Sequence, residues 1–280
     1  MEDARASTGT QGTEAWWRTS LTDISAEAIR VRGYAIEDLI GNVGLAQMLW
    51  LLIRGELPDE GRAALLEAAM LGGVVHGPHA PSIAVARMAI TCGVGINAAV
   101  AQGAAVLGDV HGGAIQQTME LLEALEGCDG SGAAVGPVLD AWAAQNGSFI
   151  PGYGHRFHRD GDPRTPRLLA LAERARQERL IDGRHIANAL AIERILSRRK
   201  NKRMPMNLDG VAGAIYLELG FAPPIGRGLV VLGRSIGVLA NAWEEMNSGS
   251  RLKGPVPPSV GFLYEGPPPR RLPSSEERTE

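Results

Sequence analysis

Three short segments of the sequence place histidine or aspartate beside glycine, a combination typical of sites where the backbone lies close to a ligand. The first is GDVHGGA, in which His111 and two glycines precede a helix-forming run of Ala, Gln, Met, Glu and Leu. Because each glycine weakens a helix by about 1 kcal/mol, the pair points to a close approach of the backbone. The positive end of a helix beginning here lowers the pKa of His111 and favours a neutral imidazole that donates one hydrogen bond. A tight turn with an incidental histidine is the alternative interpretation.

The second segment, PGYGHRFHRDGDPR, spans residues 151–164 and holds two histidines, three arginines and two aspartates. A solvated charged loop is one interpretation of such a run. Gly152 and Gly154 bracket a tyrosine immediately before His155, which favours a shaped turn instead. Arg164 follows Asp-Pro at a predicted helix start, where its guanidinium can bind a carboxylate through two hydrogen bonds.

The third segment, KNKRMPMNLDGVAG, spans residues 200–213 and places Asp209 between two apolar stretches. An aspartate at this place can cap a helix. It can also be a general base whose pKa is raised in an apolar pocket. From the residues alone the cap is the favoured interpretation.

Two further patterns are weaker evidence for a functional site. GRSIG, residues 233–237, matches the nucleophile elbow G-x-S-x-G around Ser235, but that fold requires a histidine after the serine, and the last histidine is His185. We expect His185, inside a helical run, to be a surface or boundary residue. The spacings His-x-x-His at residues 76–79 and 155–158 lack an HExxH or cysteine partner, so we expect no metal site.

Helical patterns dominate the rest of the chain, and aromatic residues make up only 5%. Amphipathic spacing, proline at helix starts and glycine at helix ends predict the elements. We therefore expect an all-α protein with helices over residues 43–54, 59–71, 114–126, 137–145, 163–180, 183–200 and 225–246.

The composition bounds the class of protein. The 280 residues suffice for one large domain or two ordinary ones, and 45% of them are hydrophobic. A net charge of -3 without a basic block argues against a nucleic-acid partner. Cys92 and Cys128 fit a reducing cytoplasm, and no apolar stretch predicts a membrane span or a secretory signal. We expect about 15 N-terminal and about 12 C-terminal residues to be disordered.

Together and in this order, DVHGGA, GYGHRFHRDGDPR and PMNLDGVAG resemble the motifs of the citrate synthase family. RGYAIEDLIGN at residues 32–42 and LIRGELP at residues 52–58 resemble its N-terminal signature. The short chain, GPHAPS and PMNLDG are more similar to the citryl-CoA lyase branch of the family. The resemblance implies an all-α homodimer whose subunit has a large domain (1–111 and 218–280), a small domain (112–217) and an active-site cleft between them.

The resemblance also implies the ligands and the roles of site residues. A CoA thioester and a 2-oxo acid are the implied substrates, with no metal and no prosthetic group. Asp209 would remove a proton from the thioester methyl group, His111 would donate a hydrogen bond to the enolate oxygen, and His155 would handle the proton on the oxo acid oxygen. The implied substrate-binding residues are His76 (with His79 as the alternative), Arg164, Arg251 and Lys253. The implied contacts to CoA phosphates are Arg159, Lys202 and Arg203.

Two positions depart from the family pattern. Ile115 stands where many members have asparagine, and Gly254 stands where an arginine helps to bind carboxylates. The function that we predict is making or breaking the carbon–carbon bond between acetyl-CoA and oxaloacetate, or similar substrates, in the cytoplasm, with citryl-CoA cleavage favoured. The alternatives are a citrate synthase that also hydrolyses citryl-CoA and a non-catalytic CoA-binding dimer.

Overall fold

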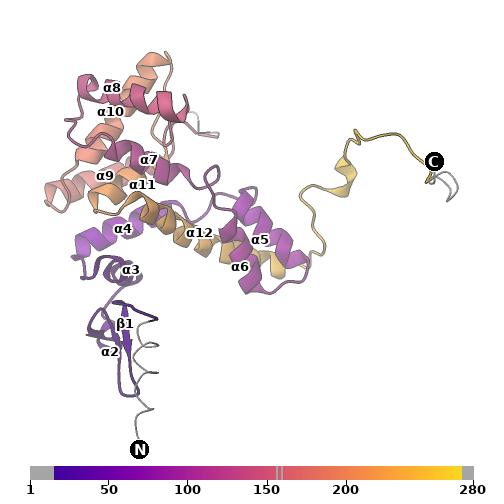
Figure 1. Cartoon of the computed structure of the whole chain (residues 1–280), viewed down its shortest axis with the longest axis horizontal. Coiled ribbons are helices and arrows are strands. Elements are labelled where there is room, and N and C mark those ends of the chain that lie inside the picture. The colour runs from indigo at the N-terminus through magenta and orange to yellow at the C-terminus, as the bar shows by residue number, and fades with distance from the viewer. Residues whose placement is uncertain (1–15, 156, 159, 273–280) are drawn as a thin grey trace, which may run out of the picture.

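The computed structural model of the chain describes residues 16–155, 157–158 and 160–272. Helices make up almost all of its regular structure (Figure 1), which confirms the predicted fold class. The helices are α2 (Ile36–Leu39), α3 (Leu45–Arg54), α4 (Glu60–Gly72), α5 (Pro81–Thr91), α6 (Ile96–Ala105), α7 (Ala114–Glu123), α8 (Gly132–Asn146), α9 (Arg164–Gln177), α10 (Arg184–Arg199), α11 (Leu208–Glu218), α12 (Pro223–Met246) and the short 3-10 helix η1 (Pro258–Val260).

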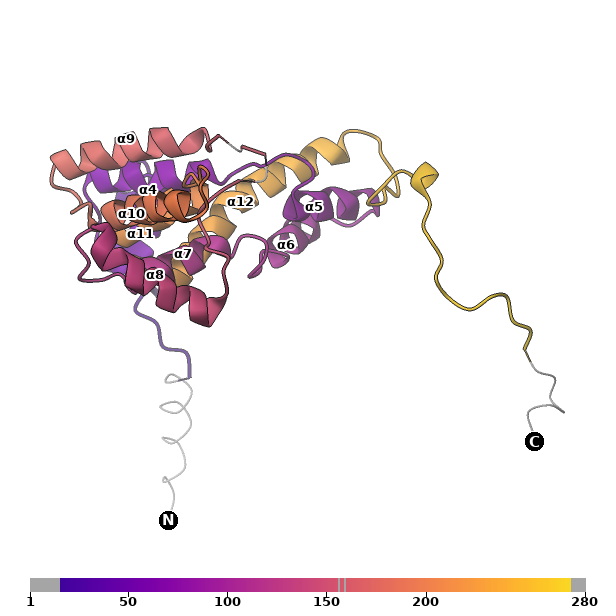
Figure 2. The ribbon, with the colours of Figure 1, turned by 90° about the horizontal axis from the view of Figure 1, so that it is seen from above.

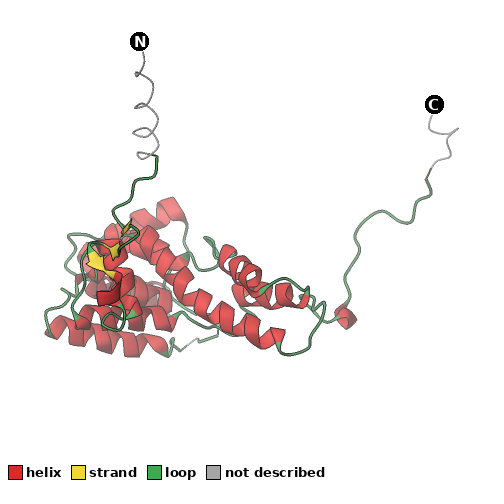
Figure 3. Ribbon diagram, turned by 90° about the horizontal axis from the view of Figure 1, so that it is seen from below, coloured by secondary structure: helices red, strands yellow, loops and turns green. Residues whose placement is uncertain are grey.

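A small antiparallel sheet precedes the helices, and sequence analysis did not predict it. Its strands are β1 (Thr22–Ile24), β2 (Ile29–Val31) and β3 (Tyr34–Ala35), in that order across the sheet. Figure 3 shows the strands beside the main helical body, at the same side as the start of the described chain. Strands of two or three residues are too short to show the period-two alternation by which a strand is recognised.

Two hydrophobic cores hold most of the helices together. The larger core is formed by α3, α4, α7 to α11 and the first half of α12, whereas the smaller one joins α5 and α6 to the second half of α12. Helix α12 therefore runs through both bodies, as Figure 2 shows. The large core includes helices on both sides of the predicted boundary at residue 112, and the division into a large and a small domain stays a prediction.

Local sequence explains where several helices begin and end. Helix α3 ends at Gly55, which has a left-handed conformation with φ 91°, as the sequence predicted. Helix α8 begins at Gly132 and not at residue 137, because Ser131 caps it by accepting the N–H of Ala134. The prediction placed the start at Pro137 because proline favours the first helical position, and here it lies in the second turn instead.

The GRSIG segment lies in the middle of α12 and is not a nucleophile elbow. Ser235 donates its hydroxyl to the Val231 carbonyl 2.7 Å away, as a serine inside a helix does. The two glycines allow close packing, since a Cβ on Gly237 would lie 1.9 Å from the Val74 carbonyl oxygen. Among the described residues, α12 is the one helix long and apolar enough to span a membrane, a test that core helices of soluble proteins also pass.

The prediction that His185 is a surface or boundary residue is wrong. Its side chain is buried, and its Nδ1 has no hydrogen-bond partner among the described residues. The Glu218 carboxylate accepts the N–H groups of Gly183, His185 and Ile186, which holds the first turn of α10 against α11. The resulting burial lowers the pKa of His185.

Candidate active site

The loop that carries His155 pairs with the segment before α11. The Gly154 N–H donates to the Pro205 carbonyl at 2.7 Å, and the Asn207 N–H donates to the Gly152 carbonyl at 2.9 Å. The Asn207 side-chain amide also donates to the Gly154 carbonyl at 2.7 Å. These bonds bring His155 next to the first turn of α11, which carries Asp209, although about 50 residues separate the two segments in sequence.

Two glycines make this pairing possible. Gly152 has a φ of +87°, a conformation that favours glycine. A Cβ on Gly152 would lie 2.9 Å from the Gly210 Cα, and a Cβ on Gly210 would lie 2.5 Å from the Gly152 carbonyl oxygen. The two segments thus touch backbone to backbone, which confirms the prediction of a shaped turn before His155.

Asn207, and not Asp209, caps α11. Its Oδ1 accepts the N–H groups of Asp209 at 2.9 Å and Gly210 at 3.3 Å. The capping interpretation of Asp209 is therefore wrong, because an asparagine two residues earlier already binds the free N–H groups of the first turn. Burial raises the pKa of the Asp209 carboxyl, and the positive charges of Arg164 and Arg234 partly oppose the increase. A partly buried carboxylate with a raised pKa is suited to accept a proton.

Arg164 does pair with a carboxylate, but the partner belongs to its own loop. Its Nε and Nη2 donate to the two oxygens of Asp162 at 2.8 and 2.7 Å. Its Nη1 donates to the Gly72 carbonyl at the end of α4. These bonds hold the pKa of Asp162 at about 2, against the cost of burying it, so the pair stays charged.

Arg234 is a site residue that sequence analysis missed. It is only 9% exposed, and its Nε donates to the Gly73 carbonyl, the neighbour of the carbonyl that Arg164 binds. Its Nη1 and Nη2 have no protein partner among the described residues, which leaves them able to bind an anion. The signal was present in GRSIG, where the arginine between the glycines, and not the serine, is the chemically important residue.

His76 lies against the ring of His155. The two ring centroids are 5.4 Å apart, with the planes nearly perpendicular. Partial burial and the charges of Arg164, His155 and Arg234 lower the pKa of His76, which favours the neutral ring. His79 has no such ring contact among the described residues, so the geometry favours His76 as the histidine beside the site.

The glycines after His111 allow a tight turn in which Gly113 packs against the backbone of Asp109. Gly112 has a φ of +91°, and a Cβ on Gly113 would lie 2.6 Å from the backbone of Asp109. The expected close approach exists, but another part of the loop makes it rather than a ligand. Ile115, at the departure from the family pattern, is fully buried in the large core and is only 1% exposed.

His111 is fixed by the beginning of α5. Its Nε2 accepts the Ser82 N–H at 3.2 Å and lies 3.0 Å from the Ser82 Oγ. The pKa of His111 is lowered, as predicted, but the causes are burial and the charge of Arg234 rather than the helix that follows it. That helix, α7, begins three residues later, at Ala114.

Backbone donors assign the tautomers of both histidines, since an N–H group can only donate. At His111 the Ser82 N–H points at Nε2, so the proton of a neutral ring is on Nδ1. At His155 the N–H groups of Phe157 and His158 donate to Nδ1 at 3.1 and 3.0 Å, so the proton is on Nε2. Each ring thus has one N–H left to donate to a ligand.

Other predicted site residues lie elsewhere. The Lys253 ammonium group is paired with Glu245 at 2.9 Å, and Glu245 is eleven residues beyond Arg234 on α12, or about 16 Å along the helix. Arg251, and Lys202 and Arg203 after α10, are exposed. Arg159 lies outside the described residues. In the described part of the chain, no three His, Cys, Asp or Glu side chains gather as metal ligands do.

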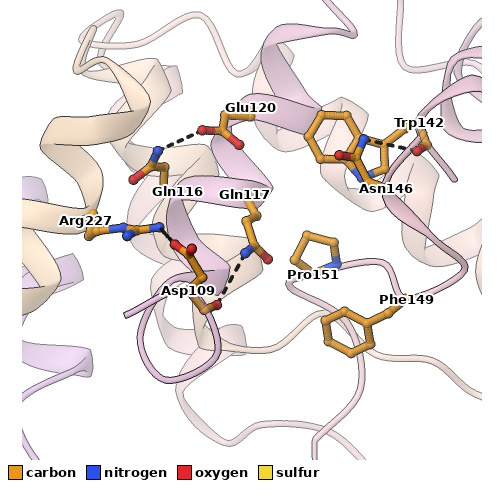
Figure 4. Close-up of a pocket in the computed structure, with 9 residues that line it drawn as sticks. All are labelled: Asp109, Gln116, Gln117, Glu120, Trp142, Asn146, Phe149, Pro151 and Arg227. Atoms are coloured by element: carbon orange, nitrogen blue, oxygen red, sulfur yellow. Dashed lines mark hydrogen bonds and ion pairs between the residues drawn. The ribbon is translucent and has the colours of Figure 1, made fainter. Parts of the chain in front are cut away.

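A cavity of about 340 Å³ opens beside both histidine loops (Figure 4). Asp109, two residues before His111, and Pro151, four before His155, both line it. An ion pair of 2.5 Å joins Asp109 to Arg227 of α12. The complete lining is Asp109, Gln116, Gln117, Glu120, Trp142, Asn146, Phe149, Pro151 and Arg227.

Comparisons with known proteins identify the family and the fold of this chain. The family model described as citrate synthase, C-terminal domain, matches residues 63–255. The structure of citryl-CoA lyase from Hydrogenobacter thermophilus is 32% identical with a TM-score of 0.82, covering 95% of this chain and 100% of that one. ATP citrate lyase from Methanothrix soehngenii, in complex with citrate and coenzyme A, has a TM-score of 0.77 at 21% identity over 99% of this chain and 46% of that one.

A citrate synthase from Acidithiobacillus ferridurans is 28% identical over 239 residues, which are 84% of this chain and 58% of that protein. The matched residues are 54% of a putative citrate synthase 2 from Mycobacterium tuberculosis, so the chain spans little more than half the length of these two relatives.

Proposed function

The chain belongs to the citrate synthase family, and we propose that it cleaves citryl-CoA into acetyl-CoA and oxaloacetate, or catalyses the same carbon–carbon bond step in reverse. The observation that carries the proposal is the convergence of a partly buried carboxylate, Asp209, with His155 and two arginines at the start of α11. The 32% identity and the TM-score of 0.82 to a citryl-CoA lyase support the lyase direction.

In the condensation direction, Asp209 removes a proton from the acetyl methyl group. The Nδ1–H of neutral His111 donates to the forming enolate oxygen, which needs a donor that is fixed before the charge develops. The enolate carbon then attacks the oxo acid carbonyl, whose oxygen takes the Nε2 proton of His155 and becomes the tertiary hydroxyl, and the ring regains a proton from solvent. Asp209 ends this step protonated.

In the cleavage direction the same groups act in reverse order. The tertiary hydroxyl of citryl-CoA gives its proton to Nε2 of His155 as the carbon–carbon bond breaks, and protonated Asp209 gives a proton to the departing carbon. Nε2 of His155 must therefore be free of its own proton before cleavage. The ring proton then has to move to Nδ1, which requires the amides of Phe157 and His158 to turn away.

Arg164 and Arg234 are suited to hold the carboxylates of the oxo acid. They bind consecutive carbonyls, of Gly72 and Gly73, so their guanidinium groups lie on the same stretch of backbone. The ring of His76 lies against that of His155, and the charges of both arginines lower its pKa. For Lys253 to bind substrate, its ion pair with Glu245 has to break first.

The nonreacting part of the acyl-CoA has two candidate contacts. The 340 Å³ cavity borders both histidine loops and offers aromatic rings and side-chain amides. Lys202 and Arg203 are exposed and precede Pro205, whose carbonyl accepts the Gly154 N–H, and this nearness in sequence to the His155 loop supports a contact to CoA phosphates. Arg159 belongs to the same proposal on sequence grounds.

We also propose that the protein is a cytoplasmic homodimer. One face of α12 exposes a stripe of large apolar residues, each about half exposed: Leu232, Ile236, Leu239, Trp243 and Met246. Together with α6, part of this stripe lines an apolar groove. Exposed apolar surfaces of this kind mark protein contacts, and a helix stripe is self-complementary when a second copy packs antiparallel to it.

Incubation with citryl-CoA, and separately with acetyl-CoA plus oxaloacetate, tests the proposal. We expect acetyl-CoA and oxaloacetate from the first mixture. Free CoA and citrate from the second would instead identify a citrate synthase that hydrolyses its intermediate. Calorimetric binding of CoA with no turnover in either mixture would favour a non-catalytic CoA-binding protein and overturn the proposal.

A further inference from the structure

We propose that Asp162 is a positioning residue whose single carboxylate fixes both the guanidinium of Arg164 and the first turn of α11, which carries Asp209. This inference rests on the proposed function, because it concerns the oxo acid contact and the base of that reaction. Asp162 does not contact substrate in this proposal, because both of its carboxylate oxygens accept hydrogen bonds from Arg164 or α11.

The hydrogen bonds of Asp162 divide between the two elements. Its Oδ1 accepts the Arg164 backbone N–H at 3.0 Å and the Arg164 Nε at 2.8 Å. Its Oδ2 accepts the Arg164 Nη2 at 2.7 Å and the Leu208 N–H at 3.1 Å. Leu208 is the first residue of α11, and its N–H has no partner inside the helix. A displaced carboxylate would therefore move the oxo acid contact and the base together.

A neighbouring bond reinforces this connection. The Thr165 hydroxyl donates to the Met206 carbonyl at 3.1 Å, and both residues are buried. Asp162 itself is only 2% exposed, so water does not compete for its oxygens. Hydrogen bonds to a charged group are stronger than neutral ones, and four of them end on this carboxylate.

The charge of Asp162 also affects the pKa of Asp209, the proposed base. Three charged groups shift the pKa of Asp209: Arg164 on α9, Arg234 on α12 and Asp162 in the loop. The charge of Asp209 in turn raises the pKa of Tyr216 on α11. Arg164 and Arg234 lower the pKa of Asp209, whereas Asp162 raises it. Without the negative charge of Asp162, the charge of Arg164 is uncompensated, and the pKa of Asp209 falls.

The test compares Asp162→Asn with Asp160→Asn, which removes the same charge from an exposed residue of the same loop. For Asp162→Asn we expect kcat/KM for oxaloacetate to fall by about 10²-fold, as for a small misplacement of reacting groups. We also expect the acid limb of the condensation pH profile to move to lower pH. Oxaloacetate affinity by calorimetry should weaken. Asp160→Asn should match the wild type in all three measurements.

The outcomes separate the two proposals. If the wild type is active and Asp162→Asn equals Asp160→Asn, the positioning role is overturned while the proposed function stands. If the wild type neither turns over nor binds oxaloacetate, the proposed function fails and this inference fails with it. If Asp162→Asn does not fold, Asp162→Glu is used, which keeps the charge but lengthens the side chain. We expect Asp162→Glu to keep the acid limb of the wild-type pH profile and to bind oxaloacetate more weakly. An oxaloacetate affinity equal to that of the wild type would overturn the positioning role of Asp162.

Discussion

The backbone N–H of Ser82 donates to the Nε2 of His111 at 3.2 Å, so the amide at the start of α5 determines which ring nitrogen carries the proton. The hydroxyl of the same serine lies 3.0 Å from Nε2 but is not needed for this assignment, because a hydroxyl can donate or accept. The two contacts can therefore be separated by mutation.

We expect Ser82→Ala to keep kcat within a few-fold of the wild type, since the amide remains. His111→Ala should lose about 10²–10³-fold in kcat, the usual cost of removing a donor from a forming oxyanion. Steady-state cleavage of citryl-CoA measures both variants. A loss for Ser82→Ala as large as that for His111→Ala would mean that the hydroxyl, and not the amide, orients the ring.

Asp209→Asn should lower kcat by about 10²–10⁴-fold, because it removes the general base while keeping the shape of the side chain. In the condensation direction the base acts as the carboxylate. Because burial raises the pKa of Asp209 above that of an ordinary aspartate, activity should rise with pH through that raised pKa. A pH profile of kcat/KM checks this, and an acid limb that is identical in the variant would assign the titration to another group.

Arg234→Gln should raise the KM for oxaloacetate by about 10-fold or more, since a charge-assisted contact is worth about 1.5–3 kcal/mol. The variant keeps a donor for the Gly73 carbonyl, so the loop before His76 is held. Arg167→Gln, an exposed change on α9, is the matched control and should be neutral. Equal KM values for the two variants would remove Arg234 from oxo acid binding.

The ion pairs of Glu245 should make the stability of the protein depend on pH. Lys253, Ser250 and Arg87 lower the pKa of this buried carboxyl from 4.5 to about 2, against its desolvation. A depressed folded-state pKa contributes stability that is complete above the unfolded value and lost as pH falls toward 2. The shift corresponds to about 3 kcal/mol.

Glu245→Gln should therefore lower the free energy of unfolding at neutral pH and flatten its decrease between about pH 4.5 and pH 2. Urea unfolding at a series of pH values measures this. Glu244→Gln, which removes the neighbouring exposed carboxylate, is the control. A pH dependence in Glu245→Gln equal to that of the wild type would contradict the assignment.

Ile236→Lys should prevent self-association if α12 forms the dimer contact, because it places a charge in the middle of the apolar stripe. Sedimentation equilibrium at micromolar concentration should then give the mass of one chain, against two for the wild type. Leu45→Lys, an exposed change on α3, should leave the mass unchanged. A dimeric Ile236→Lys variant would place the interface elsewhere.

The sequence predicted the helical class, the turn before His155 and the chemically important segments, because glycine, proline and helical periodicity act locally. It did not predict that Asn207 caps α11, because a capping residue is recognised by its position just before the first helical residue, and the sequence did not show that this residue is Leu208. Arg234 was missed for a different reason: its partner, the Gly73 carbonyl, is about 160 residues away. Likewise, local sequence cannot show that Lys253 binds Glu245, because that pairing depends on how the chain returns after α12.

The contact between Gly152 and Gly210 has a consequence for how this protein can be altered. The separation of His155 and Asp209 depends on main-chain atoms, which are the same in every amino acid, at two positions where no larger residue fits. A search for variants with new acyl or oxo acid preferences can therefore vary side chains of the cavity lining while Gly152 and Gly210 stay unchanged. Libraries that vary these two glycines should contain almost exclusively inactive members.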